Sequence, residues 1–374
     1  MTELVSWLKA MDPRETKLNI LLLALPITLY FNYVDQNYSM AFFSSLIAIM
    51  PLAFLMGRAT EEIALRTTES LGGLLNATFG NAAELIIAVL LILEASRVAD
   101  PETQSFFIHL VQASLIGSIL GNLLLVMGLA FVWGGIHHSE QKYSETQVSS
   151  NGSLLLLSMI VLVIPTVFHS SVGGEGGDSR LLDLSHIAAA ILLLVYGLFL
   201  LFQFRTHVHL FATDGSHHEE PEMTQRDSII LLVVATVLVS WMAEILVHSV
   251  EYAAEDFGLP HLFIGVILLP LFGNAAEHFT AVTVAGKDKM DLSFAISMGS
   301  STQIAVFIAP LMVIVAWALC VPLTFEFGIL ETVSAFLAVL IVNSIAADGK
   351  SNWLEGAMLL SSYGVLAAAF LFHP

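Results

Sequence analysis

Long apolar runs set the strongest limit on how this chain can fold. Eleven of them could cross a bilayer as helices, which takes about 20 mostly apolar residues each. Hydrophobic residues fill 56% of the 374 positions, more than one water-soluble core could bury. We therefore predict an all-α, polytopic membrane protein. The predicted transmembrane helices are 18–34, 40–63, 71–94, 105–133, 151–170, 183–204, 228–250, 261–284, 292–320, 327–347 and 353–372.

Lysine and arginine are distributed unevenly between the two sides of these runs. The side of the N-terminus holds eleven of them, whereas the other side holds only Arg97 and Arg180. Because positive residues concentrate in cytoplasmic loops, we expect a cytoplasmic N-terminus. With an odd number of helices, the C-terminus then lies on the opposite side. Residues 1–17 are polar and charged, and the first apolar run is expected to stay in the chain as a spanning segment, so no cleaved signal peptide is expected.

The motif Gly-Asn-Ala-Ala-Glu occurs twice, at 80–84 and at 273–277. In addition, Gly-Ser at 117–118 matches Gly-Ser at 299–300. One N-terminal helix followed by two five-helix halves accounts for this pattern. Since five is odd, the second half enters the membrane from the opposite face, and the repeats are inverted. The predicted segments are 1–39 with the first helix, 40–204 as the first repeat, 205–226 as a linker and 227–374 as the second repeat.

Glu84 and Glu277, the last residues of the two motif copies, lie inside apolar runs. An ionised carboxylate near the bilayer centre costs on the order of 3 kcal/mol, so it must be paired, hydrated, protonated or bound to a cation. Neither predicted helix contains a lysine or arginine. In each copy an asparagine, Asn81 or Asn274, precedes the glutamate by three residues and shares its helix face. This pattern predicts a site for a cation or for protons.

Neutral oxygen-bearing side chains follow each copy. Ser118 and Asn122 are four residues apart, and Ser300 and Gln303 are three apart, so each pair shares a helix face. Carboxylate and neutral oxygens suit calcium, which takes about six to eight oxygen ligands. Cys320 is the only cysteine, and no His-Glu-x-x-His or Cys-x-x-Cys pair occurs. Soft-metal chemistry and an intramolecular disulfide are therefore not expected.

The motif copies, the 117–118 and 299–303 stretches and the 348–356 segment resemble the calcium branch of the cation/proton exchangers, within the calcium/cation antiporter superfamily. The resemblance implies eleven helices, a cytoplasmic N-terminus and calcium efflux driven by inward proton flow. It also implies that certain residues form the site. Glu84 and Glu277 would bind the ion, and Asn81, Asn274, Ser118, Ser300 and Gln303 would line the site, with Asn122 one residue out of register with Gln303.

A single carboxylate pair could serve both ions. When ionised, the pair would balance the charge of a divalent cation. When protonated, the pair would release the cation, most simply with two protons per calcium. Ala83 and Ala276 stand where the sodium/calcium exchangers of the superfamily carry proline, which favours protons over sodium as the driving ion. A sodium- or other-cation-coupled exchanger is the alternative. A cation channel is less favoured, because inverted halves suit alternating access.

A second acidic set precedes the motifs and repeats at an offset of 182. The resemblance places these carboxylates along the approach to the site, where they would concentrate cations. The alternative is that these residues, near helix ends and close to Arg58 and Arg66 in the first half, are solvated or ion-paired. The set consists of Glu62, Glu69, Glu244 and Glu251.

The linker at 205–226 is rich in histidine and acid and is expected in the cytoplasm. The linker has three interpretations. It is a solvated loop, a regulatory calcium sensor as the resemblance suggests, or a histidine cluster that binds a metal or senses pH. The candidate regulatory residues are Asp214, Glu219, Glu220 and Glu222.

The formal net charge is -19, but much of the acid lies within or beside apolar runs, so nucleic acid is not an expected partner. The expected partners are calcium ions, protons and membrane lipid, and no cofactor is expected. The sequence leaves open whether the protein forms a homo-oligomer. No nucleophile and base stand beside the acids, so no enzyme activity is expected.

Overall fold

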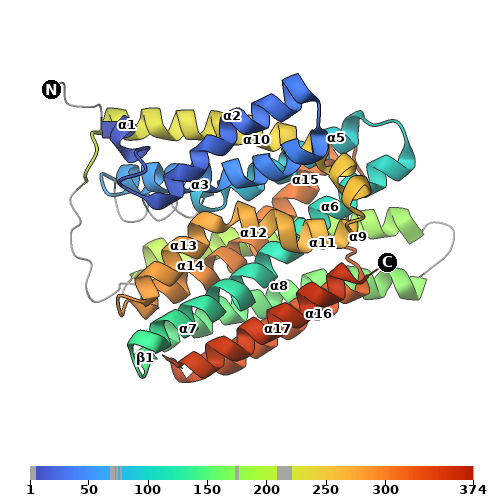
Figure 1. The fold of residues 1–374 in the computed structure, drawn as a ribbon. Helices are drawn as coiled ribbons and strands as arrows, with labels where there is room; N and C mark the ends of the chain where they lie inside the picture. Colours follow the sequence, from blue (N-terminus) through green and yellow to red (C-terminus); the bar gives the residue numbers. More distant parts are fainter. Residues whose placement is uncertain are drawn as a thin grey trace. The chain divides into compact units, whose positions relative to one another are not determined.

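The computed structural model describes residues 6–67, 72, 75, 78–172, 177–208 and 221–373. Nearly all of these residues are helical, and the two strands β1 (Gln141–Lys142) and β2 (Lys350–Ser351) pair antiparallel (Figure 1). The chain divides into two compact units. Unit 1 comprises Met1–Leu90, Thr213–Leu259 and Leu271–Glu277, and unit 2 comprises Leu91–Ala212, Pro260–Pro270 and His278–Pro374.

Unit 1 is built on two long helices that pack along each other, α3 (Tyr38–Ala64) and α10 (Gln225–Phe257). Each begins with a side-chain cap, because the Asn37 carboxamide accepts from Met40 N and the Thr224 hydroxyl accepts from Asp227 N. Gly258 ends α10 in a left-handed conformation with φ of 60°. Four shorter elements precede α3: α1 (Ser6–Ala10), η1 (Lys17–Leu23), α2 (Ala24–Tyr30) and η2 (Phe31–Asp35).

Most of the remaining elements belong to unit 2. They are α5 (Ala82–Arg97) from Leu91 onward, α6 (Pro101–Leu120), η3 (Gly121–Val126), α7 (Met127–His137), α8 (Glu145–Val172), α9 (Gly177–Leu201), η4 (Phe202–Thr206), α11 (His261–Phe263), η6 (Ile264–Leu268), α14 (Met290–Gln303), η7 (Ile304–Ile308), α15 (Ala309–Ala318), α16 (Ile329–Ile345), η8 (Ala346–Asp348) and α17 (Trp353–Leu371). Two short helices, α12 (Leu269–Gly273) and α13 (Ala275–Ala285), contribute to both units.

Nine helices in the described part of the chain are long and apolar enough to cross a membrane, and they coincide with nine of the eleven predicted runs. The predicted helix at 261–284 is a pair, His261–Gly273 and Ala275–Ala285, bent by 58°. The predicted helix at 71–94 lies partly outside the described residues, and its described part includes the start of α5. The protein is therefore a multi-pass membrane protein of nine or ten spans in its described part.

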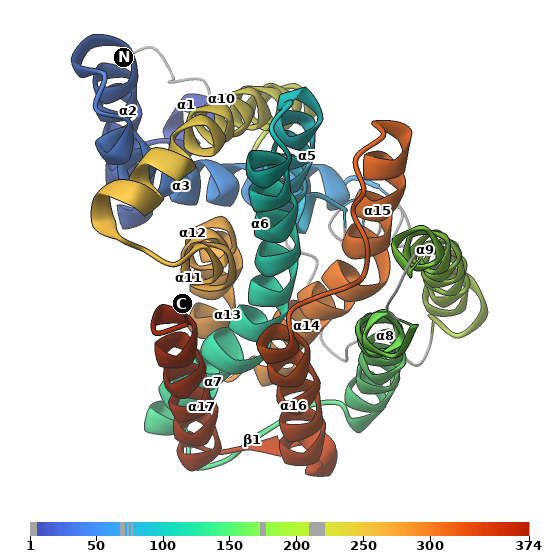
Figure 2. The same ribbon diagram turned by 90° about the vertical axis from the view of Figure 1, so that its right-hand side faces the viewer.

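The exposed apolar residues of α9 indicate a helix that faces lipid. Ile187, Ile191, Leu194 and Leu198 are exposed and follow one another at intervals of three or four residues, so they form one stripe. Such a stripe is stable against lipid and costly against water. Helix α9 packs against α8 on another side (Figure 2).

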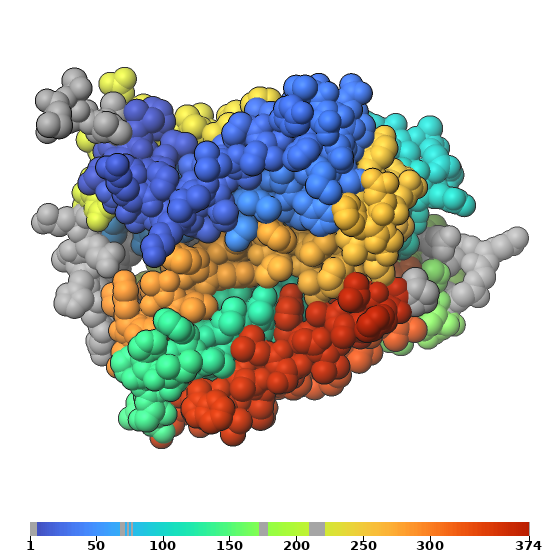
Figure 3. Space-filling view, in the orientation of Figure 1, coloured from blue at the N-terminus to red at the C-terminus, as the bar shows by residue number. Residues whose placement is uncertain are grey.

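Close packing and loop contacts hold unit 2 together. Gly128 of α7 and Gly356 of α17 let the two helix backbones approach, since a Cβ on Gly356 would lie 2.6 Å from Gly128 O. Figure 3 shows the red surface of α17 directly against the green surface of α7. Beside the β1–β2 pair, the Tyr143 hydroxyl donates to Lys350 O at 2.7 Å, and burial raises the pKa of this phenol, so it stays a donor.

Candidate functional site

Both copies of the repeated motif interrupt a helix at their asparagine. Asn81 forms a turn between a helical segment ending at Gly80 and helix α5, and Asn274 does the same between α12 and α13. Glu84 and Glu277 consequently lie in the first turns of α5 and α13. The positive end of the helix dipole favours a carboxylate there.

The two copies lie against each other within unit 1. A Cβ built on Gly80 would be 3.6 Å from Glu277 Oε1, and a Cβ built on Gly273 would be 3.6 Å from Glu84 Oε1. Each carboxylate thus faces the glycine of the other copy. The structure therefore brings together Glu84 and Glu277, the residues for which the sequence predicted a shared site.

Several buried polar atoms in these copies lack hydrogen-bond partners. Both carboxylate oxygens of Glu84 and both polar side-chain atoms of Asn274 are buried with no partner among the described residues. Buried polar groups in proteins are nearly always satisfied, so oxygens of this kind are candidates to bind a proton, a water molecule or a cation. Carboxylate and carboxamide oxygens are the ligands that a hard cation such as calcium takes.

The residue types at the motifs differ from those of a transition-metal centre. Among the described residues, no group of three or more His, Cys, Asp or Glu side chains is placed to hold a metal ion. Transition-metal centres are usually built from such groups. A cation at the motifs would instead share two carboxylates and neutral oxygens.

Four of the predicted neutral ligands, Ser118, Asn122, Ser300 and Gln303, are in unit 2. Asn122, in the π-helical turn η3 after α6, donates through Nδ2 to Ser300 Oγ of α14 at 2.9 Å. Both residues are buried, as is Ser118. Gln303 is the last residue of α14, directly before the second π-helical turn, η7. Two of the four residues are thus in direct contact, and π-helical turns of this kind are frequent at functional sites.

The predicted access-path carboxylates are in different environments. Glu62 is buried and bonded to Arg66 and to backbone at the end of the linker. Glu244 and Glu251 are exposed on α10. Glu69 lies outside the described residues.

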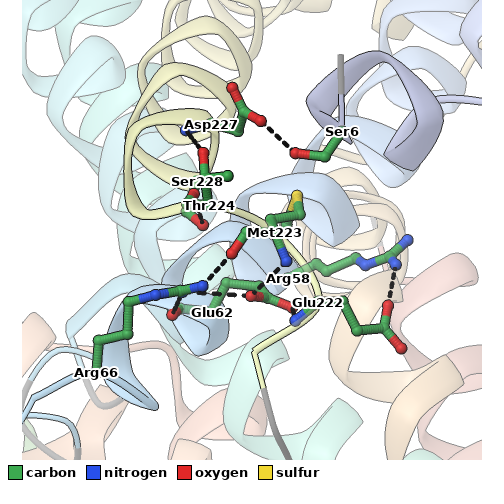
Figure 4. Close-up of polar contacts among 9 residues, drawn as sticks. All are labelled: Ser6, Arg58, Glu62, Arg66, Glu222, Met223, Thr224, Asp227 and Ser228. Carbon is green, nitrogen blue, oxygen red and sulfur yellow. Dashed lines mark hydrogen bonds and ion pairs between the residues drawn. The ribbon is translucent and has the colours of Figure 1, made fainter. Parts of the chain in front are cut away.

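Of the candidate regulatory residues in the linker, Asp214, Glu219 and Glu220 lie outside the described part of the chain. Glu222 is described, and its carboxylate pairs with Arg58 (Figure 4).

The sequence gives no signal for some of the contacts that hold loops in place. Gln112 of α6 donates through Nε2 to Thr324 O at 3.0 Å and to Glu326 O at 2.8 Å, and no motif around Gln112 indicates this role. The cap on α10 was readable, because Thr224 and Asp227 have the Thr-x-x-Asp spacing of a helix start.

Many apolar helices and two carboxylates at paired helix breaks are the features of a multi-pass membrane protein that handles ions within the bilayer. The family model described as sodium/calcium exchanger protein matches residues 38–205 and 227–372. The chain belongs to this sodium/calcium exchanger family.

Individual relatives are similar over nearly the whole chain. A Ca(2+)/H(+) antiporter of Aphanothece halophytica is 43% identical over 369 residues, which cover 95% of this chain and 96% of that protein. A vacuolar calcium ion transporter of Schizosaccharomyces pombe is 39% identical and covers 95% of this chain and 85% of its own length. The solved structure of native YfkE matches with a TM-score of 0.81 and 35% identity over 95% of this chain and 99% of that one.

Proposed function

We propose that this protein is a secondary active transporter that exchanges calcium for protons and exports calcium from the cytoplasm. The observation that carries the proposal is the reciprocal packing of Glu84 and Glu277 against Gly273 and Gly80. The unsatisfied oxygens of Glu84 and Asn274 support a hard cation as ligand. Relatives that cover nearly all of the chain are named Ca(2+)/H(+) antiporters.

The chemistry follows from what one carboxylate pair can hold. Ionised Glu84 and Glu277 balance the charge of one divalent cation, and protonation removes that charge and releases it. Asn81 and Asn274 add carboxamide oxygens beside them. Since an empty site with two charges is costly inside the bilayer, the carrier crosses between its two open states only with calcium or with protons bound. Obligatory exchange results, most simply of two protons for one calcium.

We further propose the finer architecture on the basis of the sequence. The chain has eleven transmembrane helices, of which the last ten form two inverted five-helix repeats, 40–204 and 227–374, joined by the 205–226 linker. The N-terminus is cytoplasmic and the C-terminus is on the opposite side, as the lysine and arginine distribution supports. The ligand roles of Ser118, Asn122, Ser300 and Gln303 stay predictions from the sequence.

A flux experiment in sealed proteoliposomes tests the function. An outward-directed proton gradient should drive calcium uptake into vesicles, and calcium should in turn drive proton movement. Uptake that requires a sodium gradient instead would identify the sodium-coupled alternative. Calcium flux without any counter-ion would show a channel and would refute the exchanger.

A further inference from the structure

Three charged residues follow one another at intervals of four residues at the end of α3: Arg58 and Glu62 in the helix, and Arg66 two residues after it. All three bind the last residues of the linker (Figure 4). We call them the linker clamp. Because the clamp and the linker end both belong to unit 1, their contacts lie within one compact body.

Glu62 is the centre of the clamp. Its Oε1 accepts from Glu222 N at 3.0 Å and its Oε2 accepts from Met223 N at 3.1 Å, so both oxygens are used. The residue is only 6% exposed. A buried carboxylate that accepts two backbone N–H groups is held in one position.

The two arginines complete the contact. Arg66 lies 3.4 Å from Glu62 Oε2 through Nη1 and donates through Nη2 to Met223 O. Arg58 Nη2 lies 2.9 Å from Glu222 Oε2. The backbone of Met223 is therefore held at both its N–H and its carbonyl, and the Met223 side chain is buried.

The clamped residues lead directly into α10. Thr224, next in the chain, caps α10 by accepting from Asp227 N at 3.2 Å, and Asp227 accepts a hydrogen bond from the Ser6 hydroxyl. The N-terminal helix α1 is thereby attached to the same point. At the other end of the pair, Ser39 of α3 donates to Asp256 of α10, and the rings of Tyr38 and Tyr252 are 4.8 Å apart. Polar contacts thus join α3 and α10 near both ends.

We propose that Glu62 is a positioning residue, which fixes the linker end and the start of α10 on α3, and is not a carboxylate that attracts cations to the site. Its charge is already balanced by Arg66 and by two N–H donors, which leaves little field to concentrate cations. Through the clamp, Glu222 and Met223 hold the start of α10 in place, and the exchange rate depends on that position. This inference rests on the proposed function only where transport is the readout.

The transport test compares Glu62→Gln with Arg66→Gln in the full-length protein. If the clamp positions α10, both variants lower the maximal exchange rate by roughly tenfold, the effect of losing a buried charged hydrogen bond, and leave the half-saturating calcium concentration unchanged. If Glu62 attracts cations, Glu62→Gln raises the half-saturating concentration and Arg66→Gln lowers it. Opposite shifts of this kind would overturn the proposal. Glu255→Gln, which changes an exposed carboxylate of α10, is the control.

A labelling test is independent of transport. Met223→Cys is introduced with Cys320→Ser, which removes the only native cysteine. In detergent, the thiol at 223 should react slowly with a maleimide, and Glu62→Ala should speed the reaction by roughly tenfold by releasing the linker end. An unchanged labelling rate would contradict the clamp even if calcium exchange is confirmed. Faster labelling without exchange activity would retain the clamp and reject the proposed function.

The charge swap Arg58→Glu with Glu222→Arg sharpens both tests. Each single change places like charges together and should speed labelling at position 223, whereas the double change restores the pair and should return the rate towards that of the parent. A double variant that labels as fast as the faster single variant would show that the Arg58–Glu222 pair does not hold the linker.

Discussion

The two copies of the repeated motif have the same five residues and the same helix break, yet their polar groups are not in the same state. In the first copy the glutamate, Glu84, has both oxygens unsatisfied; in the second it is the asparagine, Asn274. Glu277 and Asn81 do not lack interactions. A sequence repeat thus reproduces backbone geometry, whereas the environment of each side chain depends on the elements packed around it.

Removing either carboxylate should have the largest effect. We expect Glu84→Gln and Glu277→Gln each to reduce proton-driven calcium uptake by about a hundredfold or more, because losing one partner of a buried charge interaction costs roughly 3–5 kcal/mol. Uptake in proteoliposomes measures this. Glu94→Gln, on the same helix as Glu84 but paired at the surface with Arg97, is the control and should behave like the parent. Equal transport by Glu84→Gln would rule out the shared site.

Substitutions of the two motif asparagines should have different effects on stability. Asn274→Ala removes a buried, unsatisfied carboxamide, so we expect it to raise the free energy of unfolding without calcium by about 1–3 kcal/mol. Asn81→Ala should not do so, since Asn81 has an interaction to lose. Thermal unfolding with and without calcium provides the measurement, and the calcium-dependent stabilisation should shrink in Asn274→Ala. Equal stabilities of the two variants would mean that the copies are equivalent.

The helices that follow the two motif copies are joined by a buried hydrogen bond. Because Asn122 donates to Ser300 in a fully buried setting, Ser300→Ala should lower the free energy of unfolding by about 1–2 kcal/mol. A double-mutant cycle with Asn122→Ala tests the contact: the double variant should lose less stability than the sum of the single variants. Strict additivity would show that the pair is not coupled.

The motif glycines should give the smallest effect. A methyl group at position 80 or 273 would lie in ordinary contact with the opposite carboxylate, at 3.6 Å. Gly80→Ala and Gly273→Ala should therefore fold, and each should gain up to about 1 kcal/mol of stability from helix propensity. They should also desolvate the carboxylate and weaken calcium binding a few-fold. Isothermal titration calorimetry would detect this, and unchanged affinity in both variants would contradict the reciprocal packing.

Much of the fold could be predicted from the sequence, because the length of an apolar run is a local property of the chain. Nine of the predicted runs are helices of the expected length, and the bend at Asn274 agrees with the glycine beside it. One partner of Glu62 was anticipated, because pairing with Arg66 was the alternative that the sequence offered. The N–H groups of Glu222 and Met223 could not be predicted, because they come from the far end of the linker. The Asn122–Ser300 contact likewise depends on which helices pack together.

The crossed arrangement of the motifs also bears on how such a protein can evolve. The space available to Glu84 is limited by Gly273, and that of Glu277 by Gly80, so each copy limits which residues the other can carry. A larger side chain at either glycine would need a compensating change at the carboxylate of the other copy, so the two copies can change only together.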